Sequence, residues 1–147
     1  MAKHFTLPYE GGLIEKDLPA GILHNYEKIW THVFADSHPA TYEIADTIIE
    51  AIKAKKDGLF RLGLTTGVTP ATLYRVLARR CKEGEFSFKN VEIVSIDEYY
   101  PSTGRDAQSR NRILHEALID HIDIDKKNVH IPDGTVAASE VTTYCIK

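Results

Sequence analysis

A short loop rich in hydroxyl groups, "TTGVT" at residues 65–69, lies between the apolar run "LGL" and the helix-forming run "PATLY". Its glycine permits close approach of the backbone to a ligand. A helix that follows the loop directs free N–H groups and the positive end of its dipole toward it, which suits a phosphate dianion. A plain strand-to-helix turn with a threonine cap explains the same residues equally well. The candidate phosphate-binding residues are Thr65, Thr66, Gly67, Val68 and Thr69.

Two acidic residues, Asp97 and Glu98, follow a second apolar run, "VEIVSI" at 91–96. Neighbouring side chains on an extended chain point in different directions, so the two carboxylates need not share a role. Asp97 lies nearer the strand end, where partial desolvation suits a general base. Polar residues that merely terminate a strand are the competing interpretation. A phosphate anchor and a carboxylate base at one sheet edge would suit proton abstraction from a sugar phosphate.

Hydrophobic periodicity predicts alternating helices and strands around these two loops. A helix over 37–58 has Pro39 in its first turn and Gly58 as its stop. A second helix is predicted from Pro70, with Thr69 as its cap. Strands are predicted at 59–64, 91–96 and 128–131, and further helices over 109–120 and at the C-terminal end. This alternation predicts an α/β fold, with an open, mostly parallel, Rossmann-like sheet and helices on both faces.

The composition is that of one globular domain: 147 residues, 43% hydrophobic and 27% charged. A net charge of −3 argues against nucleic acid as a partner. No apolar run approaches the ~20 residues that cross a bilayer, and the N-terminus lacks a signal-peptide pattern. Cys81 and Cys145 have no ligand spacing, which favours a reduced, cytoplasmic protein. Residues 1–35 are expected to be an N-terminal extension, and 36–147 the domain.

The chain resembles the glucosamine-6-phosphate deaminase (isomerase) family in three stretches: "LGLTTGVTPATLY", "GEFSFKNVEIVSIDEYY" and "SRNRILHEALIDHIDIDKKNVHIPDG". The resemblance implies a reversible aldose–ketose isomerisation with loss of ammonia, from glucosamine 6-phosphate to fructose 6-phosphate. It implies that Asp97 moves a proton between C2 and C1 through an enolamine, with Glu98 in support and residues 66–69 as the phosphate loop. It implies no metal or organic cofactor, since a carboxylate can shuttle the proton unaided.

Four positions depart from the family's pattern. Thr65 stands where many members have proline, and Val68 where small or polar residues are more usual. Asn111 and Arg112 replace aromatic residues, which leaves the identity of the sugar open. Three arginines could reach an anionic substrate, although we expect them to be solvated: Arg105, Arg110 and Arg112. His115 is expected to be a structural or surface residue.

The family's Asp-Gly-His motif, whose histidine aids sugar ring opening, has no counterpart, because "PDGTV" at 132–136 contains no histidine. We therefore expect residues 36–147 to be the N-terminal half of such a domain, inactive alone. A phosphosugar-binding sensor domain and a 6-phosphogluconolactonase-like hydrolase are the alternatives; residues 1–35 show no basic recognition helix for the former. The expected partner is a small sugar phosphate, and a homo-oligomer is compatible with the sequence.

Overall fold

The computed structural model describes residue 34 and residues 36–146 of the chain. The N-terminal extension predicted at 1–35 therefore lies outside the described residues, apart from residue 34. In the described part of the chain, no helix combines the length and the apolar character that crossing a membrane requires.

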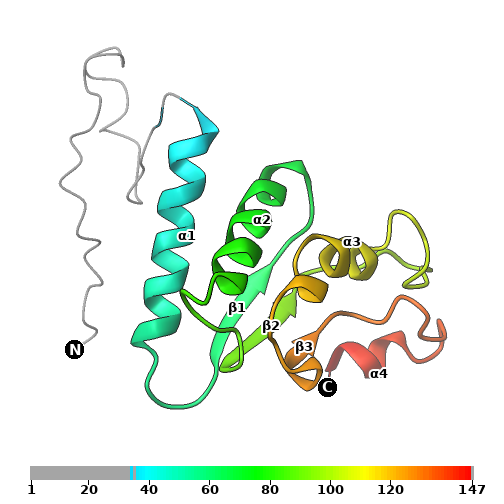
Figure 1. Cartoon of the computed structure of the whole chain (residues 1–147). Coiled ribbons are helices and arrows are strands. Elements are labelled where there is room, and N and C mark those ends of the chain that lie inside the picture. The colour runs from blue at the N-terminus through cyan, green and yellow to red at the C-terminus, as the bar shows by residue number, and fades with distance from the viewer. Residues whose placement is uncertain (1–33, 35, 147) are drawn as a thin grey trace, which may run out of the picture.

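The described strands form one parallel sheet, in the order β1-β2-β3 (Figure 1). The strands are β1 (Phe60–Leu64), β2 (Val91–Ser95) and β3 (Val129–His130). Helix α2 (Val68–Lys82) connects β1 to β2, and helix α3 (Arg110–Ala117) connects β2 to β3. The predicted open, parallel, Rossmann-like sheet is confirmed.

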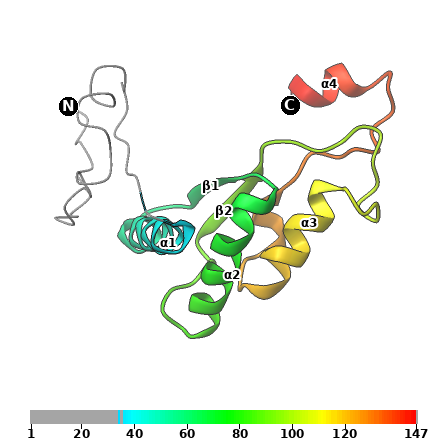
Figure 2. The same cartoon turned by 90° about the horizontal axis from the view of Figure 1, so that it is seen from above.

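The sheet is covered on one face by α1 (Ser37–Ala54), α2 and α3, which lie on the same side of the strands in Figure 2. Alternate strand residues point into this layer, among them Val91 and Ile93, which are both 0% exposed. Fully burying each such side chain stabilises the fold by about 1.5–3 kcal/mol. The helices add these side chains to the same core: Ala45, Ile49, Leu77 and Leu114.

The opposite face of the sheet carries polar side chains from all three strands. The Glu92 carboxylate accepts a hydrogen bond from Arg61 Nε at 2.6 Å and lies 3.1 Å from His130 Nε2. The Arg61 hydrogen bond holds the pKa of Glu92 below its usual range, with His130 adding to the effect. On the same face Val94 is 40% exposed. Helices were predicted on both faces, and α1, α2 and α3 supply the layer on one of them.

Helix α1 begins at Ser37 because Asp36 caps it: Asp36 Oδ1 accepts a hydrogen bond from the His38 N–H at 2.7 Å. It ends at Ala54, before Gly58, whose φ of 71° lies in the left-handed region. Among the apolar residues of α1, Ala45, Ile49 and Ile52 are buried, whereas Ile44 is 49% exposed.

Three predicted helix boundaries are wrong, the first being the end of α1 at Ala54 rather than at 58. Helix α2 begins at Val68 rather than Pro70, so Gly67 and not Thr69 is its N-cap. Pro70 is tolerated at the third helical position because the N–H it lacks has no partner within the helix there. The helix predicted over 109–120 ends at Ala117, after which the chain turns at Leu118 into the short 3₁₀ helix η1 (Ile119–His121).

The last described element, α4 (Val141–Ile146), lies beside the loop that follows β3 (Figure 1). The Asp133 N–H donates a hydrogen bond to the Tyr144 hydroxyl oxygen at 2.8 Å. This contact connects the C-terminal helix to the loops at the carboxyl edge of the sheet.

Candidate functional site

The two predicted site loops lie at the same edge of the sheet. Strands β1 and β2 run parallel, with Leu64 paired with Ser95 as the last residues of each. The Ile96 N–H donates a hydrogen bond to the Leu64 carbonyl at 3.1 Å, which extends the pairing by one step. The loop at 65–67 and the Asp97 segment therefore leave neighbouring strands side by side, at the carboxyl edge where open α/β sheets bind ligands.

Tyr74 of α2 restrains the loop at 65–67 through a hydrogen bond to the first residue of that loop. The Tyr74 hydroxyl donates a hydrogen bond to the Thr65 carbonyl oxygen, and Tyr74 is only 3% exposed. Burial raises the pKa of this phenol, against the opposing effect of the hydrogen bond. In a trans peptide the C=O and the N–H point in opposite directions. Tyr74 therefore turns the N–H of Thr66 away from the helix, toward the open edge.

The turn into α2 requires a glycine. Gly67 has a φ of 139°, which side chains disfavour, although a Cβ there would meet only Pro70 Cδ at an ordinary 3.8 Å. Within residues 36–146, the backbone N–H groups of Thr66, Gly67 and Val68 have no hydrogen-bond acceptor, and the buried Thr66 Oγ1 has no partner. Val68 is 94% exposed, so its side chain leaves the backbone accessible. Free N–H donors at a helix N-terminus are an arrangement that suits a phosphate.

Asp97 lies at the rim of the same edge, and its side chain is 49% exposed. It is therefore more open than the partial desolvation expected from its position at the strand end. Asp97 Oδ2 lies 3.4 Å from Arg110 Nε, and the Asp97 carbonyl accepts a hydrogen bond from the Ser95 hydroxyl at 3.1 Å. The carboxylate is thus open to a ligand on one side and faces a cation on the other.

Glu98 has a different environment from its neighbour. Its Oε1 accepts hydrogen bonds from the N–H groups of Tyr99 and Arg110, each at 2.8 Å. Its Oε2 accepts from the Ser109 hydroxyl at 2.8 Å and from the Asn111 N–H at 2.9 Å. Burial alone would raise the pKa of Glu98, but these hydrogen bonds lower it overall. This geometry fixes the first turn of α3 and leaves Glu98 poorly suited to accept a proton.

A third loop, after β3, packs against the Asp97 segment. The Ser102 N–H donates to the Gly134 carbonyl at 2.9 Å. A Cβ on Gly134 would lie 2.5 Å from the Tyr99 carbonyl oxygen and 2.6 Å from the Ser102 carbonyl oxygen, so only glycine fits. The loop that contains Gly134 therefore packs tightly on the segment that follows Asp97.

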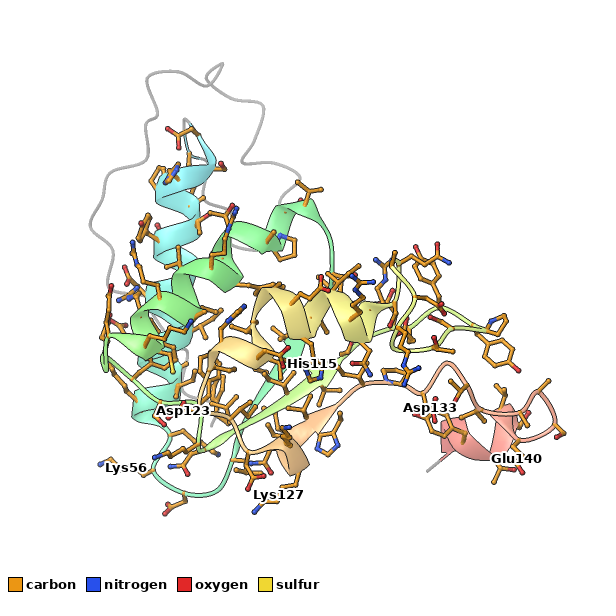
Figure 3. All side chains as sticks on the ribbon, turned by 45° about the vertical axis from the view of Figure 1, so that its right-hand side comes forward. Lys56, His115, Asp123, Lys127, Asp133 and Glu140 are labelled. Carbon is orange, nitrogen blue, oxygen red and sulfur yellow. The ribbon has the colours of Figure 1, made fainter. Side chains whose placement is uncertain are left out.

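His115 has the structural role expected of it. His115 Nδ1 lies 2.8 Å from Asp120 Oδ1, which ties α3 to η1. In the view of Figure 3, His115 lies between Asp123 and Asp133. The contact with Asp120 thus accounts for His115 within the α3–η1 segment.

Arg110 is the residue whose environment differs most from the expectation. Arginines in this segment were expected to be solvated, and Arg112 indeed has a side chain 43% exposed, paired with Glu116. The Arg110 side chain is 23% exposed and its guanidinium carbon lies 4.5 Å from the centroid of the Tyr99 ring. No local sequence pattern distinguishes Arg110 from Arg112, because both lie in the first turn of one helix.

Residues 35–145 match the model of the family described as glucosamine-6-phosphate isomerases/6-phosphogluconolactonase. The chain belongs to this family. A glucosamine-6-phosphate deaminase-like protein of Bacteroides thetaiotaomicron is 38% identical over 133 residues, which cover 89% of this chain and 20% of that protein. A glucosamine-6-phosphate deaminase of Shewanella woodyi is 42% identical over 90 residues, covering 61% of this chain and 33% of that protein.

Solved structures of the glucosamine-6-phosphate isomerase/6-phosphogluconolactonase family share the fold. A monomeric glucosamine-6-phosphate deaminase superposes with a TM-score of 0.67 at 30% identity, covering 74% of this chain and 45% of that one. A 6-phosphogluconolactonase from Thermotoga maritima gives a TM-score of 0.59 at 24% identity, over 74% of this chain and 47% of that one. The chain thus spans less than half the length of these relatives.

Proposed function

We propose that this chain forms the phosphate-binding and proton-transfer half of a glucosamine-6-phosphate deaminase. The observation that carries the proposal is the pairing of Leu64 with Ser95, because it brings the loop at 65–69 and Asp97 to one edge. The deaminase relatives and the deaminase structure support this substrate class.

In the proposed reaction, the N–H groups of residues 66–68 bind the sugar phosphate at the N-terminus of α2. Binding energy from the phosphate, which does not react, holds C1 and C2 of the sugar against Asp97. Asp97 removes the C2 proton and returns it to C1, and the resulting ketose imine loses ammonia on hydrolysis. Glu98 takes no proton in this scheme, since its hydrogen bonds already hold it ionised.

The sequence contains no Asp-Gly-His motif, so the 147 residues lack the histidine that the family resemblance implies for ring opening. We therefore expect the chain alone to release no ammonia from glucosamine 6-phosphate. We expect weak or no binding of a sugar phosphate to the isolated chain. In the full-length gene product, inorganic phosphate or the sugar phosphate should shift the amide NMR signals of Thr66 and Gly67 before any others. Unchanged signals at these two residues would contradict the phosphate-binding part of the proposal.

The enzymatic part is tested on the full-length gene product by measuring ammonia release from glucosamine 6-phosphate. Asp97→Asn should lower kcat by about 10²-fold or more, because general base catalysis contributes at least that factor. Asp120→Asn is the matched control, since Asp120 contacts His115 and lies outside the site. Full activity of Asp97→Asn would refute the assigned base, and lactone hydrolysis without ammonia release would favour the hydrolase alternative.

A further inference from the structure

Three contacts restrain Arg110, one at its backbone and two at its guanidinium group. Its backbone N–H donates to Glu98 Oε1 at 2.8 Å. Its Nη2 donates to the Tyr99 hydroxyl oxygen at 3.1 Å, and its guanidinium carbon stacks over the Tyr99 ring at 4.5 Å. An arginine stacked on an aromatic face loses much of the freedom that a solvated arginine keeps. The guanidinium therefore has a defined position at the rim of the candidate site.

This position places Arg110 against only one oxygen of Asp97. Arg110 Nε lies 3.4 Å from Asp97 Oδ2, a distance beyond that of a well-formed charged hydrogen bond, which is about 2.8 Å. The same Nε is buried and has no hydrogen-bond partner within residues 36–146. A movement of about half an ångström would complete the bond, as happens when catalytic contacts tighten on substrate binding. Oδ1 of Asp97 makes no hydrogen bond in the described residues and stays free.

We propose that Arg110 is a positioning residue for Asp97: clamped by Tyr99, its guanidinium holds Oδ2 of the carboxylate and so directs Oδ1 at the C2 proton of the sugar. This inference rests on the proposed deaminase function and deepens it. Arg110 itself does not exchange a proton. Its planar donor group matches the carboxylate in a way that a lysine ammonium cannot.

The kinetic test uses the full-length gene product with Arg110→Met, Arg110→Ala and Arg110→Lys. Arg112→Met and Arg112→Ala are the matched controls, because Arg112 lies on the same helix and pairs with Glu116 instead. Arg110→Met should lower kcat for glucosamine 6-phosphate by on the order of 10²-fold, with KM changed less than about twofold, since the reacting group is misplaced while the phosphate contacts persist. Arg110→Lys should restore only a small part of the loss.

Chemical rescue separates positioning from a merely structural role. Millimolar guanidinium ion should restore part of the kcat of Arg110→Ala and leave both Arg112 variants unchanged. If Arg110→Met keeps its kcat within about twofold, the proposal is overturned. It is also overturned if guanidinium fails to restore Arg110→Ala while circular dichroism shows that variant folded.

A second measurement does not depend on turnover. In the gene product labelled with ¹³C,¹⁵N-aspartate, scalar couplings should report one χ1 rotamer for Asp97 in the unmodified protein and an average of rotamers in Arg110→Met. Rotamer averaging already present in the unmodified protein would refute the positioning role. A different outcome separates the two proposals. If the unmodified protein releases no ammonia but has a single Asp97 rotamer that Arg110→Met abolishes, the deaminase function is refuted and the restraint on Asp97 stays supported.

Discussion

Replacing Glu98 with glutamine tests how much its hydrogen bonds between the loop after β2 and the first turn of α3 contribute to stability. Glu98 accepts four hydrogen bonds of 2.8 to 2.9 Å, two on each oxygen. Glutamine keeps one acceptor oxygen and turns an NH₂ group toward two donors. Hydrogen bonds to a charged group contribute about 1.5–3 kcal/mol each, and partial access of water reduces the loss. We expect the free energy of unfolding to fall by roughly 2–3 kcal/mol.

Urea denaturation followed by far-ultraviolet circular dichroism measures this change, with Glu116→Gln as the control. Glu116 lies on the same helix, and the same substitution removes the same charge. Its side chain is 61% exposed and, among residues 36–146, pairs with Arg112 alone in an i,i+4 contact, which is worth about 0.3–0.5 kcal/mol. If Glu98→Gln and Glu116→Gln lower the stability equally, the argument that Glu98 holds the start of α3 is wrong.

Three further predictions follow from the same loops. Folding lowers the pKa of Glu98 from its ordinary value of 4.5, so the stability that the ionised carboxylate contributes is lost as the pH falls below about that value. In acid denaturation, the difference in the free energy of unfolding between the unmodified protein and Glu98→Gln should therefore narrow. Gly134→Ala should destabilise the protein by about 1–3 kcal/mol through overlap with two carbonyl oxygens. Gly104→Ala, whose Cβ meets its nearest neighbour at 3.7 Å, should be nearly neutral. Thermal melts measure both variants, and equal changes in their melting temperatures would contradict the tight packing around Gly134. Tyr74→Phe removes the hydrogen-bond donor to the Thr65 carbonyl and should lower stability by about 0.5–1.5 kcal/mol while speeding amide exchange in the 65–67 loop. Unchanged exchange would show that the phenol does not restrain that loop.

Much of the fold follows from local patterns in the chain. The strands at 60–64 and 91–95 are short runs rich in apolar residues and bounded by turn residues, and their length and flanking residues predict strands without any tertiary information. The burial of the first strand was not predictable in this way, since Leu64 is its one buried residue. The site loops are predictable for the same reason, because ligands bind beyond the carboxyl ends of parallel strands. The boundary of α2 was misplaced by two residues, since Thr69 and Gly67 both satisfy local rules for a helix cap.

The roles of individual side chains depend on partners far along the chain. Glu98 meets donors 11 to 13 residues away in α3, and Tyr74 reaches a carbonyl nine residues before it. These hydrogen bonds form only when the crossover helices α2 and α3 pack on the sheet. The local hydrophobic periodicity of the sequence therefore does not predict them.

The amino-acid sequence by itself determined the α/β class, the family resemblance and the two loops that carry the candidate chemistry. Only the tertiary structure decided that Asp97 is open, that its neighbour Glu98 is enclosed by hydrogen bonds, and that Arg110 rather than Arg112 faces the carboxylate. The physical reason is that a residue's type fixes which bonds it can make, whereas its solvation and its partner are set by the elements packed around it.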